Sequence, residues 1–272
     1  MMIPITSLSD PRIAPYRNVK DKELDRAGNL FIAEGEHLVR RLLASDFPAE
    51  SVFVTEKHAG EFQNAVPAHV PLYVTSADVM NNILGMKFHS GIIACGRRKA
   101  WKPLDDVLPT KPGRLTLVIC PDINNVENIG SLIRLSAGFG VDAMILGEQC
   151  HDPFWRQSVR VSMGTIFSLP IYRSPNLAHD LGRLKKEWGV ELAATVLDAG
   201  AEPLEDARRG ERLALLLGSE PHGLDDTSLS ACDRRITIPM KLGTDSLNVA
   251  VAAGIFLYHF TRKKTFLAKR NN

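Results

Sequence analysis

Apolar residues along the chain fall into short runs that alternate with stretches of helical spacing. In the first hundred residues, the runs at 51–55, 71–75 and 91–95 have the length and composition of strands. Apolar residues at 38, 39, 42 and 43 keep the spacing of one helix face, so residues 36–43 are expected to be helical. A second helix is expected at 76–84, with a serine at its start as the cap. The pattern predicts a small α/β domain.

The same alternation continues after residue 113 with longer apolar runs. Strands are expected at 115–120, 143–146, 168–171, 191–196, 212–217 and 235–238, and helices at 130–138, 156–163, 176–188 and 246–264. Strands that alternate with helices are typical of a mainly parallel sheet covered on both faces. The polar, proline-bearing stretch at 97–112 keeps no such period. We therefore predict two domains, residues 1–98 and 113–272, joined by a linker at 99–112.

Composition narrows the class of protein. The 272 residues are 44% hydrophobic and 24% charged, which is ordinary for a folded soluble protein, and a net charge of +2 indicates no partner by itself. The four cysteines lack CxxC or metal-ligand spacing, so we expect buried reduced thiols and no metal. The start of the chain has no signal-peptide pattern, and the longest apolar run, 249–260, is shorter than the ~20 residues that span a bilayer. A cytoplasmic protein is expected.

Three apolar strands are each followed by a turn rich in glycine, asparagine or serine. The three segments are DINNVENIGSLIR at 122–134, LGSEPHGL at 217–224 and IPMKLGTDSLNVAVA at 238–252. Ligands of such sheets bind at the carboxyl ends of the strands, so these turns could converge on one pocket. Neither the GxGxxG nor the GxxxxGK[ST] phosphate loop occurs, which argues against a dinucleotide site or a P-loop.

Single residues in these segments also fit purely structural roles. Asparagines are common helix caps, and Arg134 could pair with Glu127 or Asp122. Asp245 or Ser246 could cap the last helix. The LGSE turn could be a plain turn, and its spacing does not fit a GxSxG nucleophile elbow. Only the three segments together favour a functional site.

The three segments, in this order and spacing, resemble the motifs of a known family. NxGxxxR (Asn128, Gly130, Arg134), LGSExxGL (217–224) and IPMxxxxxSLNVAVA (238–252) are similar to the three motifs of SpoU-type (TrmH-like) 2'-O-ribose RNA methyltransferases of the SPOUT superfamily. DPRI (10–13), FIAEGEHLV (31–39) and HSGIIA (89–94) resemble the substrate-binding domain of this family. The resemblance covers nearly the whole chain.

The resemblance implies a fold and an activity. It implies an L30e-like N-terminal RNA-binding domain and a C-terminal SPOUT domain with a deep trefoil knot, working as a homodimer. The expected reaction is the transfer of a methyl group from S-adenosylmethionine to a ribose 2'-hydroxyl of structured RNA, ribosomal RNA more than transfer RNA. A catalytically silent RNA-binding member of the same fold is the alternative.

The resemblance also implies residue roles. The expected catalytic residues are Asn128, Arg134, Glu220, Ser246 and Asn248, and the expected cofactor contacts are Thr195, Gly218, Ile238, Met240 and Leu247. Candidate phosphate contacts, chosen for their charge, are Arg12, Arg17, Lys20, Arg97 and Arg98. The motif often has glycine after its glutamate, whereas this chain has Pro221, which lacks an amide donor and so puts any amide contact at that position in doubt.

Overall fold

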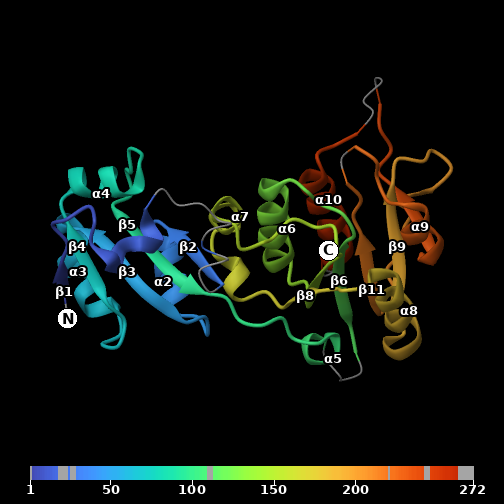
Figure 1. Cartoon of the computed structure of the whole chain (residues 1–272). Coiled ribbons are helices and arrows are strands. Elements are labelled where there is room, and N and C mark those ends of the chain that lie inside the picture. The colour runs from blue at the N-terminus through green and yellow to red at the C-terminus, as the bar shows by residue number, and fades with distance from the viewer. Residues whose placement is uncertain are drawn as a thin grey trace, which may run out of the picture. The chain divides into compact units, whose positions relative to one another are not determined.

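The computed structural model describes residues 2–17, 24, 29–108, 113–219, 221–241 and 246–262. The chain divides into two compact units (Figure 1). Unit 1 comprises Met1–Pro103, Asn124–Arg134 and His151–Pro170, and unit 2 comprises Leu104–Ile123, Leu135–Cys150 and Ile171–Asn272. Unit 1 includes two segments that follow the expected linker in the sequence. The domain boundaries predicted from the sequence stay a prediction.

Unit 1 is built on a five-stranded mixed sheet in the order β1-β4-β3-β5-β2. Its strands are β1 (Met2–Pro4), β2 (Leu30–Glu34), β3 (Ala49–Thr55), β4 (Leu72–Thr75) and β5 (Ile92–Arg97). β1, β4 and β3 run parallel to one another, whereas β5 is antiparallel to both β3 and β2. These strands alternate with helices along the chain, which confirms that this part of the chain is a small α/β unit.

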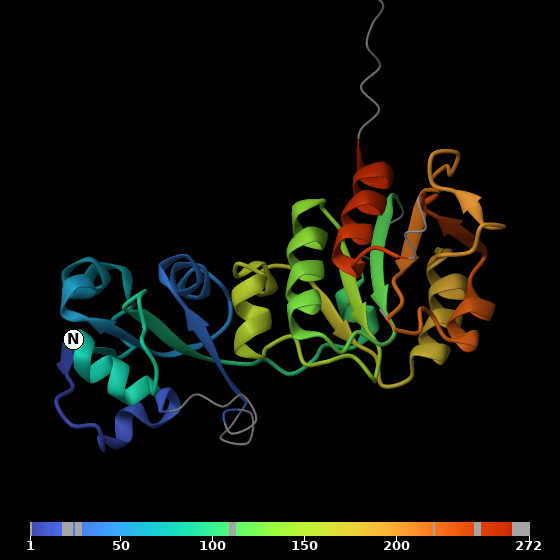
Figure 2. The ribbon, with the colours of Figure 1, turned by 90° about the horizontal axis from the view of Figure 1, so that it is seen from above.

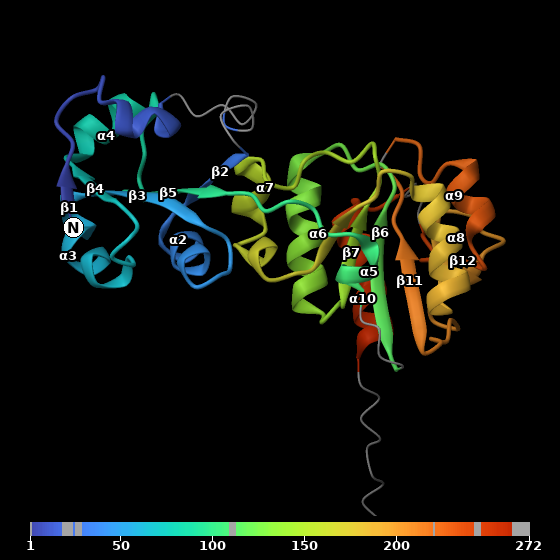
Figure 3. The same ribbon diagram turned by 60° about the horizontal axis from the view of Figure 1, so that its bottom comes forward.

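Helices cover both faces of this sheet. Figure 3 shows α4 (Ala77–Leu84) on one face and α2 (Glu36–Leu43) and α3 (Glu56–Ala65) on the other. The short 3-10 helix η1 (Pro11–Tyr16) packs into the same core as α4. Within that core the Tyr16 hydroxyl contacts Ser51 Oγ at 2.7 Å and accepts a hydrogen bond from the Cys95 amide. The buried hydroxyl therefore ties η1 to two strands.

The segment 151–170 completes unit 1. It holds α7 (Arg156–Val161) and the 3-10 helix η2 (Thr165–Phe167), and α7 packs on β2. Phe31 of β2 lies 5.2 Å from the ring of Phe154 and 5.5 Å from that of Phe167, measured between ring centroids. These aromatic contacts, together with the salt bridge between Arg156 and Glu34, explain why 151–170 belongs to unit 1.

Unit 2 contains a seven-stranded sheet in the order β10-β12-β9-β11-β6-β7-β8, and every neighbouring pair is parallel. Its strands are β6 (Leu115–Cys120), β7 (Ala143–Leu146), β8 (Ile171–Arg173), β9 (Glu191–Val196), β10 (Glu202–Pro203), β11 (Arg212–Leu216) and β12 (Arg234–Thr237). β6 and β7 are buried along their whole length. The parallel C-terminal sheet predicted from the sequence is confirmed.

The two faces of this sheet are covered by different helices. α8 (Leu177–Trp188) and α9 (Asp226–Ala231) lie on one face, and α10 (Val249–Thr261) lies on the other (Figures 1, 2 and 3). A side chain at Gly254 of α10 would lie 3.7 Å from Leu135, so α10 packs closely against the end of α6 (Val126–Gly138). The short helix α5 (Leu104–Val107) joins the core on the α8 face.

Several elements differ from the expectation, each for a physical reason. β1, α3, α9 and β10 were not expected: α3 buries only Phe62, and the other three have six residues or fewer. The expected strand at 168–171 lies at Ile171–Arg173 instead, because residues 168–170 form the turn that follows the 3-10 helix η2. The predicted knot stays a prediction, since residues 242–245 between β12 and α10 lie outside the described part.

The cysteines are free thiols, as expected. Cys95, Cys120 and Cys150 are buried and Cys232 is half-buried. Burial raises the pKa of Cys95 to about 12 and that of Cys150 to about 11. These thiols remain protonated at neutral pH and act as packing groups.

Candidate functional site

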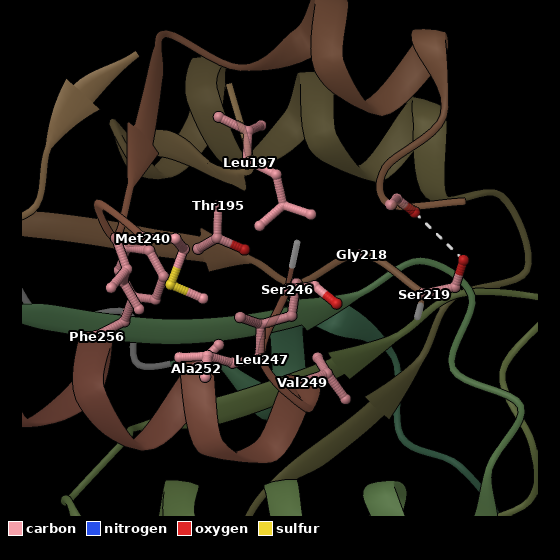
Figure 4. Close-up of a pocket in the computed structure, with 14 residues that line it drawn as sticks. Thr195, Leu197, Gly218, Ser219, Met240, Ser246, Leu247, Val249, Ala252 and Phe256 are labelled. Carbon is pink, nitrogen blue, oxygen red and sulfur yellow. Dashed lines mark hydrogen bonds between the residues drawn. The ribbon is translucent and has the colours of Figure 1, made fainter. Parts of the chain in front are cut away.

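A pocket lies at the carboxyl edge of the sheet in unit 2, where β12, β9 and β11 end side by side. Figure 4 shows its wall, which is formed by the ends of these strands and by the first turns of α10. It encloses about 670 Å³, part of which is open to solvent. Two of the three sequence segments, 217–224 and 238–252, meet here.

Six of the residues expected at the site line this pocket. They are Thr195, Gly218, Ile238, Met240, Ser246 and Leu247. The other lining residues were not expected: Val196, Leu197, Leu217, Ser219, Gly223, Val249, Ala252 and Phe256. Helical spacing contained a signal for three of these, because positions 249, 252 and 256 recur every three or four residues and therefore share one face of α10.

Gly218 is required by the shape of the pocket wall. A Cβ at this position would lie 2.3 Å from the carbonyl carbon of Gly223 and 2.6 Å from the amide nitrogen of Leu224. The loop is closed by two backbone hydrogen bonds, in which Ser219 and Gly223 each donate to the other, at 2.9 and 2.8 Å. Pro221 supplies neither donor, so its missing amide does not weaken this bridge.

Two hydrogen bonds fix the strand end and the helix start that face each other across the pocket. The Thr195 hydroxyl donates to the carbonyl of Leu216 at 2.8 Å, which joins the end of β9 to β11. Asn248 is the N-cap of α10, since its Oδ1 accepts from the amide of Ala250 at 2.9 Å. The prediction that Asp245 or Ser246 caps the helix was therefore wrong. The helix also starts later than the expected residue 246, so Asn248 precedes the first turn instead of lying inside it. The side chain of Asn248 is exposed.

The described lining of the pocket carries no charge. None of the fourteen described residues that line it has an ionisable side chain. Apolar side chains and backbone from three strand ends make up most of the wall, and Thr195, Ser219 and Ser246 add hydroxyls. Such a wall can hold an aromatic base and a sugar, and it repels neither a positively nor a negatively charged group of a ligand.

The third segment begins at the start of α6, in unit 1. Asn125 Oδ1 accepts from the amides of Glu127 at 2.8 Å and Asn128 at 3.3 Å, so Asn125 caps the helix as the sequence suggested. A Cβ at Gly130 would lie 2.5 Å from the carbonyl oxygen of Ser158. Gly130 therefore permits close packing of α6 against α7. α6 begins at 126 rather than at the expected 130 because the asparagine turn caps it earlier.

Asn128 and Arg134 differ in their surroundings. Asn128 is buried, with 6% of its surface exposed, whereas Arg134 is exposed. Among the described residues Arg134 makes no hydrogen bond or salt bridge, so the expected alternative of an ion pair with Glu127 or Asp122 is absent. The amide of Gln157 donates to Glu127 at 2.7 Å instead. The guanidinium of Arg134 is thus available to an outside anion.

The arginines expected to contact RNA in unit 1 mostly face carboxylates. Arg12 pairs with Asp10 and Arg97 with Glu50, at 2.5 and 2.7 Å. Asp10 is correspondingly acidic, because hydrogen bonds from Arg12 lower its pKa to about 2. Further contacts in this group involve Arg98, which pairs with Asp152, and Arg17, which donates to the carbonyl of Asp10. Their role in RNA binding stays a prediction.

Two expected site residues, Glu220 and Lys20, lie outside the described part of the chain. Within that part, no group of three or more histidine, cysteine, aspartate or glutamate side chains could hold a metal ion. None of the described helices combines the length and the apolar character needed to cross a membrane.

Comparison with protein families matches both halves of the chain. The profile of the SpoU rRNA Methylase family matches residues 115–258, and that of the MRM3-like substrate binding domain matches residues 10–94. An uncharacterised tRNA/rRNA methyltransferase of Mycobacterium tuberculosis is 37% identical over 93% of this chain and 89% of its own length. A 23S rRNA (guanosine-2'-O)-methyltransferase of Bacillus subtilis, RlmP, is 29% identical over 94% of this chain and 98% of its own.

Solved structures agree with these relatives. An rRNA methyltransferase from Sinorhizobium meliloti, determined with S-adenosylmethionine bound, is similar with a TM-score of 0.82 at 26% identity, over 95% of this chain and 97% of that one. An RNA 2'-O ribose methyltransferase is similar with a TM-score of 0.76 at 27% identity, over 95% of this chain and 97% of that one. The likeness covers both units of the chain.

Proposed function

The chain belongs to the SpoU rRNA methylase family, and we propose that it transfers a methyl group from S-adenosylmethionine to a ribose 2'-hydroxyl of ribosomal RNA. The observation that carries this proposal is the neutral pocket at the carboxyl edge of the sheet, lined by residues of two family motifs. A similar protein is named for its bound S-adenosylmethionine.

The described lining of the pocket suits the chemistry of the proposed cofactor. S-adenosylmethionine combines an adenosine with a positively charged sulfonium, and it supplies an electrophilic methyl group. The lining residues that the structure describes include no cationic side chain that would repel the sulfonium. Leu217, Leu247 and Phe256 offer apolar surface for the adenosine, and the backbone near Gly218 and Ile238 offers hydrogen-bonding groups.

The reaction also needs a group that tolerates negative charge, because the 2'-hydroxyl must lose its proton. Arginine stays protonated in proteins, so Arg134 is not a base. We assign Arg134 the role of clamping the phosphate beside the target ribose and stabilising the developing oxyanion, with that phosphate assisting removal of the proton. Asn128 and Ser246 orient the hydroxyl, and Glu220 orders the loop.

Asn248 takes part in this scheme through the helix that it starts. Its side-chain oxygen holds the amide of Ala250, so its first contribution is to fix the start of α10, whose residues Val249 and Ala252 line the pocket. The orientation of the substrate hydroxyl then falls mainly to Ser246, which also lines the pocket.

The choice of ribosomal RNA rests on the relatives and on unit 1. Relatives that cover most of this chain carry names that specify 23S rRNA. The match of residues 10–94 to a substrate-binding domain supports the binding of structured RNA by unit 1. We place the enzyme in the cytoplasm, where its RNA is made and assembled.

A homodimer is the proposed working form. The outer face of α10 exposes Val251, Ile255 and Tyr258, whose spacing of four and three residues places them on one stripe. A second copy of the chain is the partner we propose for this stripe. Sedimentation of Ile255→Asp at micromolar concentration is expected to give a monomer where the unchanged protein gives a dimer. Equal sedimentation of the two would contradict the assignment.

Methyl transfer to RNA tests the proposed activity. Purified protein with S-adenosylmethionine labelled in its methyl group is expected to label ribosomal RNA from cells that lack the protein, and not RNA from cells that contain it. Mapping 2'-O-methyl groups in both RNAs then gives the nucleotide. Absence of transfer and of cofactor binding would favour a catalytically silent RNA-binding protein, and label in transfer RNA alone would correct the substrate.

A further inference from the structure

A second cavity lies at the opposite edge of the sheet in unit 2, where the strands begin. It is lined by the residues before β6 and β11 and by the last turn of α10. Figure 3 shows the end of α10 and the start of β6 at the same edge of the unit. A hydrogen bond from Arg114 to the carbonyl of Phe260, at 2.9 Å, joins these two ends.

Four arginines line this cavity: Arg114, Arg208, Arg209 and Arg262. Within the described residues, none of them forms a salt bridge with a carboxylate. This contrasts with Arg12 and Arg97 of unit 1, whose charges are met by neighbouring acids. The guanidinium groups of the cavity are therefore not held in direct salt bridges with described carboxylates.

Arg209 is the best fixed of the four. Its guanidinium donates to the Thr116 hydroxyl at 3.0 Å and to the carbonyls of Leu115 and Glu211 at 2.8 and 3.1 Å, while its Nε is buried without a partner. Carbonyl and hydroxyl oxygens satisfy the donors but leave the charge in place. Burial and the charge of Arg114 lower the pKa of Arg209 to about 10, so the two cations repel each other. A bound anion would relieve this repulsion.

The side chains of Arg208 and Arg262 are free to reach a ligand. Arg208 and Arg262 are exposed, and no described residue accepts a hydrogen bond from either guanidinium. Arg262 lies over the ring of Tyr258, 6.0 Å from its centroid. His259 also lines the cavity, with its Nε2 2.8 Å from the carbonyl of Ala207. Planar guanidinium groups bind phosphate oxygens in pairs, which makes phosphate the best-suited ligand.

We propose that this cavity binds backbone phosphates of the substrate RNA, as a second contact remote from the cofactor pocket. The inference rests on the proposed function, which supplies an RNA ligand. The cavity encloses about 1530 Å³, part of it open solvent. Three carboxylates also line it, those of Glu205, Asp206 and Glu211, so the four arginines leave the lining a net charge of +1.

The position of the cavity has a consequence for the substrate. β6 has six residues, so the two edges of the sheet lie about 20 Å apart at ~3.3 Å per residue. An RNA that contacts both edges must extend several nucleotides beyond the methylated ribose. The cavity thus favours a long RNA over a short fragment.

The test uses the full-length protein with Arg208 and Arg262 replaced by glutamine, because neither guanidinium donates a hydrogen bond to a described residue. Binding of a 20-nucleotide oligouridylate is measured by fluorescence anisotropy at several salt concentrations. For single strands, log K falls with log salt by about 0.7 per phosphate contact. The double variant is expected to lower this slope by about 1.4 and to weaken binding at low salt by about tenfold or more.

Lys186→Gln is the matched control, since it removes one positive charge from the exposed face of α8 outside the cavity. Its slope should stay within about 0.3 of the unchanged protein, if each contact counts for about 0.7. An unchanged slope in the double variant, or an equal loss per charge in Lys186→Gln, would overturn the proposal.

A second arm separates RNA from a free polyphosphate. Sodium tripolyphosphate at constant ionic strength is expected to compete with the oligouridylate for the unchanged protein and not for the double variant. Loss of tripolyphosphate binding without any change in the oligouridylate slope would assign the cavity to a free anion and refute the RNA contact. Affinity for S-adenosylmethionine should be equal in all variants. If the unchanged protein did not bind S-adenosylmethionine at all, the proposed function would be contradicted, and not the RNA contact at the cavity.

Discussion

The two edges of the sheet in unit 2 differ in charge although one sheet forms both. At the carboxyl edge, the described residues that line the pocket include no ionisable side chain. At the opposite edge, four arginines without carboxylate partners in the described part of the chain line a larger cavity. An uncharged lining does not repel a cationic sulfonium, whereas the arginines attract an anionic RNA backbone. The two surfaces therefore suit ligands of opposite charge. In our proposal, the cofactor and the RNA backbone therefore bind at opposite edges of one parallel sheet.

The neutrality of the pocket sets a requirement for catalysis. Since none of the described lining residues has a cationic side chain to meet the negative charge that develops on the 2'-oxygen, we look for a cation elsewhere in the enzyme. Arg134 is our candidate because its guanidinium is exposed and unpaired among the described residues.

Arg134→Lys tests this requirement and should give the largest effect. Lysine keeps the charge but loses the planar pair of donors, so turnover should fall by about 10²-fold, as when one oxyanion donor is removed. The measurement is methyl transfer to the mapped RNA with both substrates saturating. Arg183→Lys is the control, because its ion pairs with Asp105 and Glu187 are exposed and contribute little. Near-full turnover of Arg134→Lys would refute the clamp.

Gly218→Ala tests the shape of the neutral edge. The added methyl would lie 2.3 Å from backbone of Gly223, so the loop must shift, and S-adenosylmethionine affinity should fall by about tenfold, the effect of ~1.4 kcal/mol. Titration calorimetry measures it. Gly182→Ala in α8 is the control, because a Cβ there meets no atom within 4 Å, and it should raise stability by about 0.5–1 kcal/mol. Unchanged affinity in a folded Gly218→Ala protein would mean that the loop does not shape the site.

The sequence was sufficient for much of this edge. Apolar strands followed by small and polar residues predicted that Gly218 and Ile238 would meet, because parallel strands bring their carboxyl ends together, whereas Thr195 was named only from the family resemblance. Their assignment to the cofactor came from the family resemblance. Leu197 was not expected, since an isolated leucine after a strand carries no signal of its own.

The opposite edge was harder to predict. Arg208 and Arg209, Arg262 and Arg114 come from three separate segments, and charge clusters in a sequence are usually solvated surface. Only the fold brings them to one cavity and shows which of them lack carboxylate partners among the described residues. The same limit applied to Arg12 and Arg97, whose pairing with acids depends on neighbours that a charge count does not reveal.

Leu197 offers the smallest and most specific test of the comparison. It lines the pocket yet is 66% exposed, so a charge can be placed there without burying it. Leu197→Lys should weaken the binding of S-adenosylmethionine relative to S-adenosylhomocysteine, and Leu197→Glu should strengthen it. The two ligands differ by the methyl group and the sulfonium charge, so their affinity ratio isolates the electrostatic part.

The expected size follows from Coulomb attraction near solvent. Two unit charges 4 Å apart interact by about 1 kcal/mol in water, and less at larger separations, so each variant should shift the affinity ratio by about twofold to fivefold. Leu197→Gln reports the loss of the apolar contact alone and should leave the ratio unchanged. Added salt should shrink both shifts through screening. Equal ratios in Leu197→Lys and Leu197→Glu would mean that the sulfonium lies away from this part of the wall, and neutrality would then not explain how the pocket selects its ligand.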